Sequence, residues 1–304
     1  MGSPPQDRER AGVVRIDQYR GRAGSVATLA VAISAEHITQ RFEGRDHQHS
    51  VLAIDDLSLE VRQGEFLCLL GPSGCGKSTL LNIIGGMTKP TTGEVHIGDR
   101  AITGPAPRHV AFVFQESTLL PWYSVLENFK VAAEFQGNPT GWEERARATL
   151  RTVGMEAFAG HYPNQLSTGM RQRINLARGL FLDTPILLMD EPFAALDEQT
   201  RMVLGEDLSV LLARTGKTIV FVTHSLAEAV FLADRIVVMT ARPGRVKAIA
   251  ANPEPHPRSP DFMMTPRFSE LRNELFAQLR DEIRHTVAEM REARDRYAEP
   301  RGDA

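Results

Sequence analysis

The sequence predicts an α/β fold whose sheet is parallel at least in part. Short apolar runs alternate with helical patterns along the chain, which is typical of a sheet covered by helices. Four of these runs are bounded by turn or charged residues, at positions 66–70, 186–189, 219–222 and 236–239. Uninterrupted apolar runs of this length indicate buried strands. The first run leads directly into a glycine-rich segment at 71–76, which favours a nucleotide-binding core.

Length, composition and charge narrow the class of protein. The 304 residues suffice for one large α/β domain with extensions or for two small domains. With 42% hydrophobic and 24% charged residues, the composition is that of an ordinary globular protein. The formal net charge of -3 gives no global basic field, so we expect no nucleic-acid partner. Cys68 and Cys75, the two cysteines, favour reduced thiols in a reducing compartment.

No segment of the sequence is apolar enough to cross a membrane. A spanning helix needs about 20 predominantly apolar residues. The nearest approach is the segment 219–239, which contains the ionisable side chains of His224, Glu228, Asp234 and Arg235. If the protein serves a membrane process, another chain must therefore cross the bilayer.

Residues 1–30 are expected to form a flexible leader that enters a first strand. A secretory signal is the alternative, because an arginine-bearing segment up to Arg22 precedes a mildly apolar run at 26–35. Thr28 and Ser34 interrupt that run, and acidic residues precede it, so the sequence favours the leader.

A helical region is expected at about 119–182. Glu143 and Arg147 are placed for a supporting i,i+4 ion pair on one of its helices. Four apolar residues recur at helical spacing around them: Trp142, Ala146, Leu150 and Val153. We therefore predict a helical subdomain that is inserted into the α/β core.

The last part of the chain is predicted to be a proline-rich linker followed by a helix. A turn at 242–244 precedes the prolines, and the apolar residues of the helix then form one stripe. These residues are Phe268, Leu271, Leu275, Leu279, Ile283 and Val287. We expect the stripe to pack on the chain's own domain, with a regulatory or dimer contact as the alternative.

The residues after the first predicted strand match the phosphate-loop pattern G-x-x-x-x-G-K-[ST]. Glycines let consecutive backbone N–H groups converge on phosphate oxygens, and the following helix N-terminus favours an anion. Lys77 is expected to neutralise the β and γ phosphates of ATP, and the Ser78 hydroxyl to bind Mg²⁺. Cys75 is expected to be a small filler, with oxidation that blocks nucleotide binding as the alternative. The expected nucleotide-binding residues are Gly71, Pro72, Ser73, Gly74, Cys75, Gly76, Lys77, Ser78 and Thr79.

The second motif is an apolar run that ends in two carboxylates, Asp190 and Glu191. A buried strand at 186–189 would present both at its tip. There Asp190 can reach the Mg²⁺ shell, and Glu191 can polarise the attacking water as a general base. Downstream of a phosphate loop, this pattern indicates the acidic strand of a nucleotide hydrolase.

A third motif separates this chain from other nucleotide-binding proteins. Residues 166–173 read LSTGMRQR and precede the acidic strand. Together with the two motifs above, this segment resembles the signature of the ABC ATPase family, which is LSGGQ-like and opens a helix. The chain departs from that signature at Thr168 and Met170. Ser167 and Gly169 keep the serine hydroxyl and the backbone N–H groups that an anion needs at a helix N-terminus.

Four further residues match the family pattern by their positions in the chain. Gln115 resembles the glutamine that touches Mg²⁺ or water and senses the membrane subunit. Asp197 resembles the loop aspartate that communicates across a dimer, and His224 resembles the switch histidine that contacts the γ phosphate. Phe42 resembles the aromatic residue that stacks on adenine, with a core phenylalanine as the alternative.

The resemblance implies a P-loop NTPase core of ABC type with a helical subdomain and a β subdomain. The ATPase domain would span 31–250, followed by the linker and C-terminal helix at 251–304. In this family two copies face each other head to tail, so that Ser167, Gly169 and Asp197 of one copy complete the ATP site of the other. The segment 119–127 lies where the family presents its groove to a transmembrane permease subunit.

The resemblance also implies a transport function. Residues 115–116, 120–122 and 241–244 together with Met170 resemble importer subunits for nitrate, sulfonate or taurine, to which a separate solute-binding protein delivers the solute. Such a subunit would be peripheral, at the cytoplasmic face of the cell membrane. The alternatives are an ABC protein that acts on DNA or ribosomes and a degenerate ATP-binding scaffold. The sequence lacks the tandem domains or basic face typical of the first, and it keeps the catalytic residues that the second would have lost.

Overall fold

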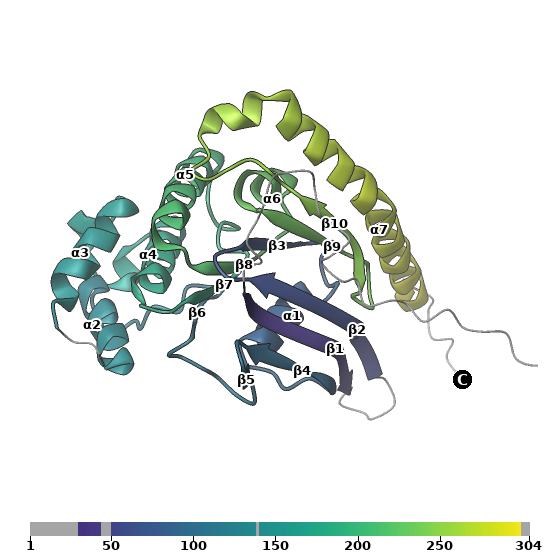
Figure 1. The fold of residues 1–304 in the computed structure, drawn as a ribbon, viewed down its shortest axis with the longest axis horizontal. Coiled ribbons are helices and arrows are strands. Elements are labelled where there is room, and N and C mark those ends of the chain that lie inside the picture. Colours follow the sequence, from purple (N-terminus) through teal and green to yellow (C-terminus); the bar gives the residue numbers. More distant parts are fainter. Residues whose placement is uncertain (1–29, 44–49, 138–139, 299–304) are drawn as a thin grey trace, which may run out of the picture.

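The computed structural model describes residues 30–43, 50–137 and 140–298, so most of the expected leader lies outside the described residues. The fold is built on two sheets (Figure 1). The six-stranded sheet has the order β10-β9-β3-β8-β7-β6, and the four-stranded sheet has the order β2-β1-β4-β5. The strands of the larger sheet are β3 (Phe66–Leu70), β6 (Val110–Val113), β7 (Ile186–Asp190), β8 (Thr218–Thr223), β9 (Arg235–Met239) and β10 (Val246–Ala251).

Five neighbouring strands of the larger sheet run parallel, and β10 pairs antiparallel with β9 at one edge. The four strands predicted from apolar runs are all present, and their residues are buried on both faces apart from half-buried Arg235. Helices on both faces explain why the runs show no alternation of polar and apolar residues. The α/β prediction with a parallel sheet is therefore confirmed.

The smaller sheet is antiparallel and packs over the helix that follows the glycine-rich loop. Its strands are β1 (Val31–Glu43), β2 (Ser50–Arg62), β4 (Thr92–Ile97) and β5 (Arg100–Ala101). Helix α1 (Lys77–Ile84) lies between the two sheets, as Figure 1 shows, and contributes Leu80 and Leu81 to the core that they share. Burial of α1 on two sides holds the start of the helix firmly in place.

Helices α2 (Val125–Gln136), α3 (Trp142–Thr152) and α4 (Thr168–Phe181) form the helical part of the molecule beside the sheet (Figure 1). The Ser124 side chain caps α2 by accepting a hydrogen bond from the backbone N–H of Glu127. The Glu127 carboxylate in turn accepts a hydrogen bond from the backbone N–H of Ser124. The predicted ion pair between Glu143 and Arg147 is present, with 2.9 Å between nitrogen and oxygen. Ala146 and Leu150 on the same helix are fully buried, as helical spacing predicted.

The C-terminal helix α7 (Pro266–Ala298) follows α5 (Glu198–Thr215), α6 (Leu226–Leu232) and β10 along the chain and packs against α6, β9 and β10. Phe268, Leu271, Leu275 and Leu279 are buried, so this part of the stripe packs on the chain's own domain. Ile283 does not belong to the buried stripe because it is 43% exposed, and the side chain of Val287 lies outside the described residues. No helix within the described ranges is long and apolar enough to cross a membrane.

Phe221 tests how far the core supports this arrangement. Its fully buried ring on β8 lies 5.6 Å from the ring of Phe66 and 5.7 Å from the ring of Phe193. We expect Phe221→Ala to lower the free energy of unfolding by about 3–5 kcal/mol, because it leaves a cavity between these rings. Urea denaturation measures this loss. The control Val203→Ala changes a residue that is 59% exposed, so it should change the free energy of unfolding by less than about 0.5 kcal/mol. An equal loss of stability in both variants would contradict the assignment of Phe221 to the core.

Candidate functional site

The candidate site lies at the carboxyl edge of the parallel sheet, where β3 continues into the glycine-rich loop. Gly74 and Gly76 adopt φ values of +78° and +98°, which favour glycine over any other residue. A Cβ on Gly76 would lie 2.9 Å from the Ala53 carbonyl oxygen, so the loop also needs a residue without a side chain there. These two positions explain why the loop requires glycines.

The Lys77 side chain folds back onto the glycine-rich loop. Its ammonium group donates hydrogen bonds to the carbonyl oxygens of Gly71 at 2.8 Å and Pro72 at 2.9 Å. The side chain is buried, which makes its charge an effective partner for an anion in the loop. Cys75 in the same loop is buried as well, and burial raises the pKa of its thiol, so the neutral form expected of a packing residue is favoured.

Ser78 and Asp190 meet at the start of α1. The Ser78 hydroxyl donates to Asp190 Oδ1 at 2.9 Å, although the two residues come from different elements. Burial raises the pKa of Asp190, the Ser78 hydrogen bond opposes that rise, and the nearby charge of Glu191 adds to it. The structure therefore brings together two of the three residues predicted to bind metal.

This pair suits Mg²⁺ better than a metal enclosed by protein ligands alone. Over the described ranges, no group of three or more His, Cys, Asp or Glu side chains could hold a metal ion. Mg²⁺ usually keeps several waters and takes one or two protein oxygens together with substrate phosphates. A hydroxyl and a carboxylate beside a phosphate loop fit that pattern.

Glu191 and His224 form the second pair of the site. His224 Nδ1 lies 3.1 Å from Glu191 Oε2, and the histidine ring is largely exposed while the carboxylate is mostly covered. Glu191 adopts a φ of +44°, an unusual value for a residue other than glycine. Its backbone N–H donates to the Val222 carbonyl at 3.0 Å, which holds this conformation against β8.

Glu228 contributes a further, largely covered carboxylate near His224, and no motif in the sequence predicts a role for it. Glu228 Oε2 accepts a hydrogen bond from the Thr223 hydroxyl at 2.5 Å, and Glu228 Oε1 lies 3.3 Å from Arg201 Nε. Burial raises the pKa of Glu228, while the hydrogen bond from Thr223 and the charge of Arg201 oppose that rise. Its position within an apolar stretch was the signal that could have revealed it.

Ser167 caps the signature helix α4 by accepting a hydrogen bond from the backbone N–H of Met170 at 3.2 Å. Thr168 begins the helix, and its hydroxyl accepts a hydrogen bond from Arg171 at 3.0 Å. Neither Thr168 nor Gly169 has a positive φ, so threonine replaces the family's glycine without backbone strain. Within the described residues, these bonds stay inside the helix and do not reach residues 71–79.

The other predicted residues lie around this edge of the molecule. Gln115 follows β6 and is exposed. Asp197 accepts hydrogen bonds from the backbone and hydroxyl of Thr200 at 2.9 and 2.8 Å, and these bonds lower the pKa of Asp197. Phe42 stands near the end of β1 and is 44% exposed, so it is not the core phenylalanine that was the alternative.

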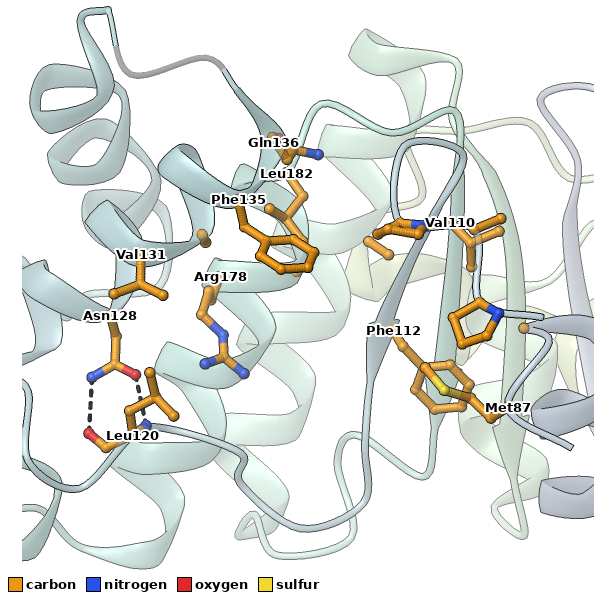
Figure 2. A pocket seen from close by; sticks show the side chains of 17 residues that line it. Met87, Val110, Phe112, Leu120, Asn128, Val131, Phe135, Gln136, Arg178 and Leu182 are labelled. Atoms are coloured by element: carbon orange, nitrogen blue, oxygen red, sulfur yellow. Dashed lines mark hydrogen bonds between the residues drawn. The ribbon is translucent and has the colours of Figure 1, made fainter.

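An apolar pocket of about 260 Å³ lies between the sheet and the helical part (Figure 2). Asn128 is a buried polar residue of its lining; its side-chain oxygen accepts from the Leu120 N–H at 2.7 Å, and its amide donates back to the Leu120 carbonyl at 3.2 Å. Trp122, within the segment predicted to face a permease, is 66% exposed nearby in the chain. Apolar side chains that line the pocket include Met87, Val110, Phe112, Leu120, Val131, Phe135 and Leu182.

Comparison with known proteins identifies relatives over most of the chain. Residues 54–194 match the profile of a family described as ABC transporter. An uncharacterized ABC transporter ATP-binding protein of Methanocaldococcus jannaschii, MJ0412, is 45% identical over 84% of this chain and 94% of its own length. The taurine import ATP-binding protein TauB of Rhizobium johnstonii is 40% identical over 86% of this chain and 99% of its own length. The nitrate import ATP-binding protein NrtC of Synechococcus elongatus is 39% identical over 84% of this chain and 39% of its own length.

A solved structure extends the comparison to the fold. A dimeric structure of the ATP-binding cassette MJ0796 bound to ADP and Pi is 34% identical to this chain and covers 72% of this chain and 98% of its own. The TM-score between them is 0.66. Fold, motifs and relatives agree, and the chain therefore belongs to the ATP-binding proteins of ABC transporters, which hydrolyse ATP for transport.

Proposed function

We propose that this chain works as a pair at the cytoplasmic face of the membrane and energises a permease that imports nitrate, a sulfonate or taurine. The observation that carries the catalytic part is the convergence of Ser78, Asp190, Glu191 and His224 at one edge of the sheet. The solute class is supported by two relatives, a nitrate import ATP-binding protein and a taurine import ATP-binding protein. Taurine carries a sulfonate group, so both solutes present a small oxyanionic group.

In this proposal residues 71–79 hold the triphosphate of ATP. The backbone N–H groups of the loop and of the start of α1 would face the phosphate oxygens. Lys77, whose ammonium group donates to two loop carbonyls, would donate to phosphate oxygens instead. Ser78 and Asp190 would bind Mg²⁺ directly, and Gln115 would reach it from the end of β6. The metal supplies charge neutralisation on the phosphates. Phe42, exposed near the end of β1, would stack on the adenine ring.

Glu191 would act as the general base. Its carboxylate would accept a proton from the attacking water, and His224 Nδ1, which lies 3.1 Å from Glu191 Oε2, would keep that carboxylate oriented. The Glu228 carboxylate fixes the strand end before His224 through its hydrogen bond with Thr223. Little covalent chemistry is needed from the protein, because catalysis depends on the position of the water and on neutralised charge.

A second copy would complete each ATP site. Ser167 and Gly169 present a capped helix N-terminus. Asp197 lies in the loop before Thr200, whose hydroxyl accepts a hydrogen bond from the Arg173 guanidinium of α4 at 2.5 Å. Neither segment bonds to the phosphate loop of its own chain within the described residues. The dimeric state of the related cassette bound to ADP and Pi supports a head-to-tail pair.

The apolar pocket would receive the permease. It opens between the sheet and the helical part, and Phe135 on its rim is 77% exposed. Exposed aromatic and apolar side chains around a concave surface favour protein binding. Gln115 stands in the chain between Phe112 and Leu120, which both line the pocket, so it would be placed to sense the permease.

Replacement of the base gives the sharpest catalytic test. We expect Glu191→Gln to bind ATP and Mg²⁺ normally but to hydrolyse ATP at least about 100-fold more slowly, because the amide cannot accept the proton. The trapped ATP should hold two copies together, which size-exclusion chromatography with ATP detects. Glu274→Gln, an exposed change on α7, is the control. Normal turnover by the Glu191 variant would contradict the assignment of Glu191 as the base.

A charge at the rim of the pocket tests permease docking. Phe135→Glu should abolish stimulation of ATP hydrolysis by the membrane subunit, because the carboxylate would be desolvated at the contact. Hydrolysis by the isolated chain should stay within about twofold of the original rate, since Phe135 lies on an exposed surface where substitutions are usually mild. Met264→Glu places the same charge on another exposed apolar residue, which is 87% exposed, and should keep the stimulation. Equal stimulation in the two variants would rule out this surface.

The solute requires the complete transporter. Affinity purification of the chain should recover a membrane subunit, and reconstitution with its solute-binding protein should give ATP hydrolysis that rises when nitrate, taurine or another sulfonate is added. Sulfate and an uncharged sugar are the controls. Stimulation by a control solute alone would overturn the solute class while leaving the ATPase assignment intact.

A further inference from the structure

The loop between β9 and β10, residues 240–245, packs directly against the phosphate loop. Gly244 is held in place by the neighbouring strand β2: its N–H donates to the Ala53 carbonyl at 2.8 Å, and its carbonyl accepts from the Asp55 N–H at 3.1 Å. A Cβ on Gly244 would overlap the carbonyl oxygen of Cys75. Backbone therefore lies on backbone at this point, and a displacement of one loop must be taken up by the other.

Arg242 in this loop orients one peptide unit of the phosphate loop. Its Nε donates to the Gly74 carbonyl oxygen at 3.2 Å. In a trans peptide the C=O and the N–H of the next residue point in opposite directions. An outward Gly74 carbonyl therefore turns the Cys75 N–H inward, where it donates across the loop to the Pro72 carbonyl at 3.4 Å. Inward N–H groups of this kind are the ligands of a phosphate.

The C-terminal helix α7 holds the loop 240–245 from the other side. Glu282 Oε2 accepts a hydrogen bond from the backbone N–H of Ala241 at 2.7 Å, and Glu282 Oε1 pairs with Lys247 Nζ at 2.6 Å. Both side chains are largely covered, at 14% and 24% exposure, so the pair is little screened by solvent. Glu282 thus fixes residues on both sides of Arg242 and Gly244.

The helix gives this carboxylate a rigid base. Four apolar side chains on the preceding turns of α7 are buried against the domain, and the segment before the helix is anchored by Arg258. The guanidinium of Arg258 donates to the carbonyls of Phe231 and Ala233 at 2.9 and 3.0 Å, at the end of the helix that follows His224. These contacts hold the backbone of α7 in place on the turns that precede Glu282.

We propose that Glu282 is a positioning residue for nucleotide binding. It acts through Ala241, Arg242 and Gly244 on the peptide units of the phosphate loop. Glu282 itself lies in the C-terminal helix, outside the residues matched by the family profile. The inference rests on the proposed role of residues 71–79 as the phosphate-binding loop. It gives α7 a function in the ATP site in addition to its packing role.

Nucleotide affinity provides the test. Glu282→Ala should raise the Kd of a fluorescent ATP analogue about three- to tenfold. This is the change expected when the hydrogen bond from Ala241 N–H to the charged carboxylate is lost and the effect reaches the nucleotide only through the loop. The rate at saturating ATP should fall by less than about twofold, since Glu191 and His224 are untouched. Glu282→Gln should recover most of the affinity, because its amide oxygen can still accept from Ala241 N. Asp281→Asn, at an exposed neighbour on the same helix, should bind as the original protein does.

A second variant separates positioning from stability. Arg242→Gln removes the guanidinium at an exposed residue, and it should raise the Kd by a similar factor. Because both residues act on the same peptide unit, the double variant should bind only as weakly as the weaker single variant. If the Glu282→Ala protein does not fold, the Kd of the Arg242 variant decides.

Four outcomes are decisive: three contradict the inference, and one contradicts the proposed phosphate loop itself. A Glu282→Ala protein with a lowered melting temperature but unchanged Kd would show a structural role only. An unchanged Kd for Arg242→Gln, or simple additivity of the two effects, would break the proposed route. Lys77→Ala is measured in parallel: if that variant still binds the analogue normally, the proposed phosphate loop itself is wrong, and the two failures are thereby distinguished.

Discussion

The hydrogen bond between Ser78 and Asp190 is the contact on which the proposed ATP site depends. The two residues meet because β3, β8 and β7 are adjacent and parallel, so the loops that follow them gather at one edge. Side chains alternate along a strand, and a slip of one residue in the pairing of β7 with β8 would turn Asp190 away from Ser78. The register of these buried apolar strands therefore also sets the position of the proposed catalytic groups.

The charges of the site are left unbalanced in a way that favours a divalent cation. Asp190 and Glu191 are consecutive carboxylates, and burial and their mutual repulsion raise the pKa of Asp190. Lys77 is the nearby cation, but its ammonium already donates to two carbonyls of the loop. A dication beside Asp190 would offset the cost of desolvating the carboxylate, and a triphosphate would in turn neutralise both cations. The site is thus more favourable with metal and nucleotide together than with either alone.

The sequence predicted the parts of the fold that depend on local pattern. Apolar runs revealed the strands, and the phosphate-loop and signature motifs correctly predicted a helix after each motif, where α1 begins at Lys77 and Ser167 caps α4. Ile283 was assigned wrongly to the buried stripe, because helical spacing does not tell where a helix leaves the surface that it covers. The roles of Glu228 and Glu282 were missed for a related reason: their partners are set by tertiary packing and carry no motif.

The unusual backbone of Glu191 shows how this packing serves the site. A non-glycine residue with a left-handed φ costs about 1–3 kcal/mol, which the surrounding structure must offset. Here the Glu191 N–H bonds to Val222 on β8, and its carboxylate faces His224 just beyond the end of that strand. The next strand thus holds both the backbone and the side chain of the proposed base. Since β8 is buried on both faces, its position can change little, and a carboxylate held by this strand is suited to the fixed orientation that the proposed base needs.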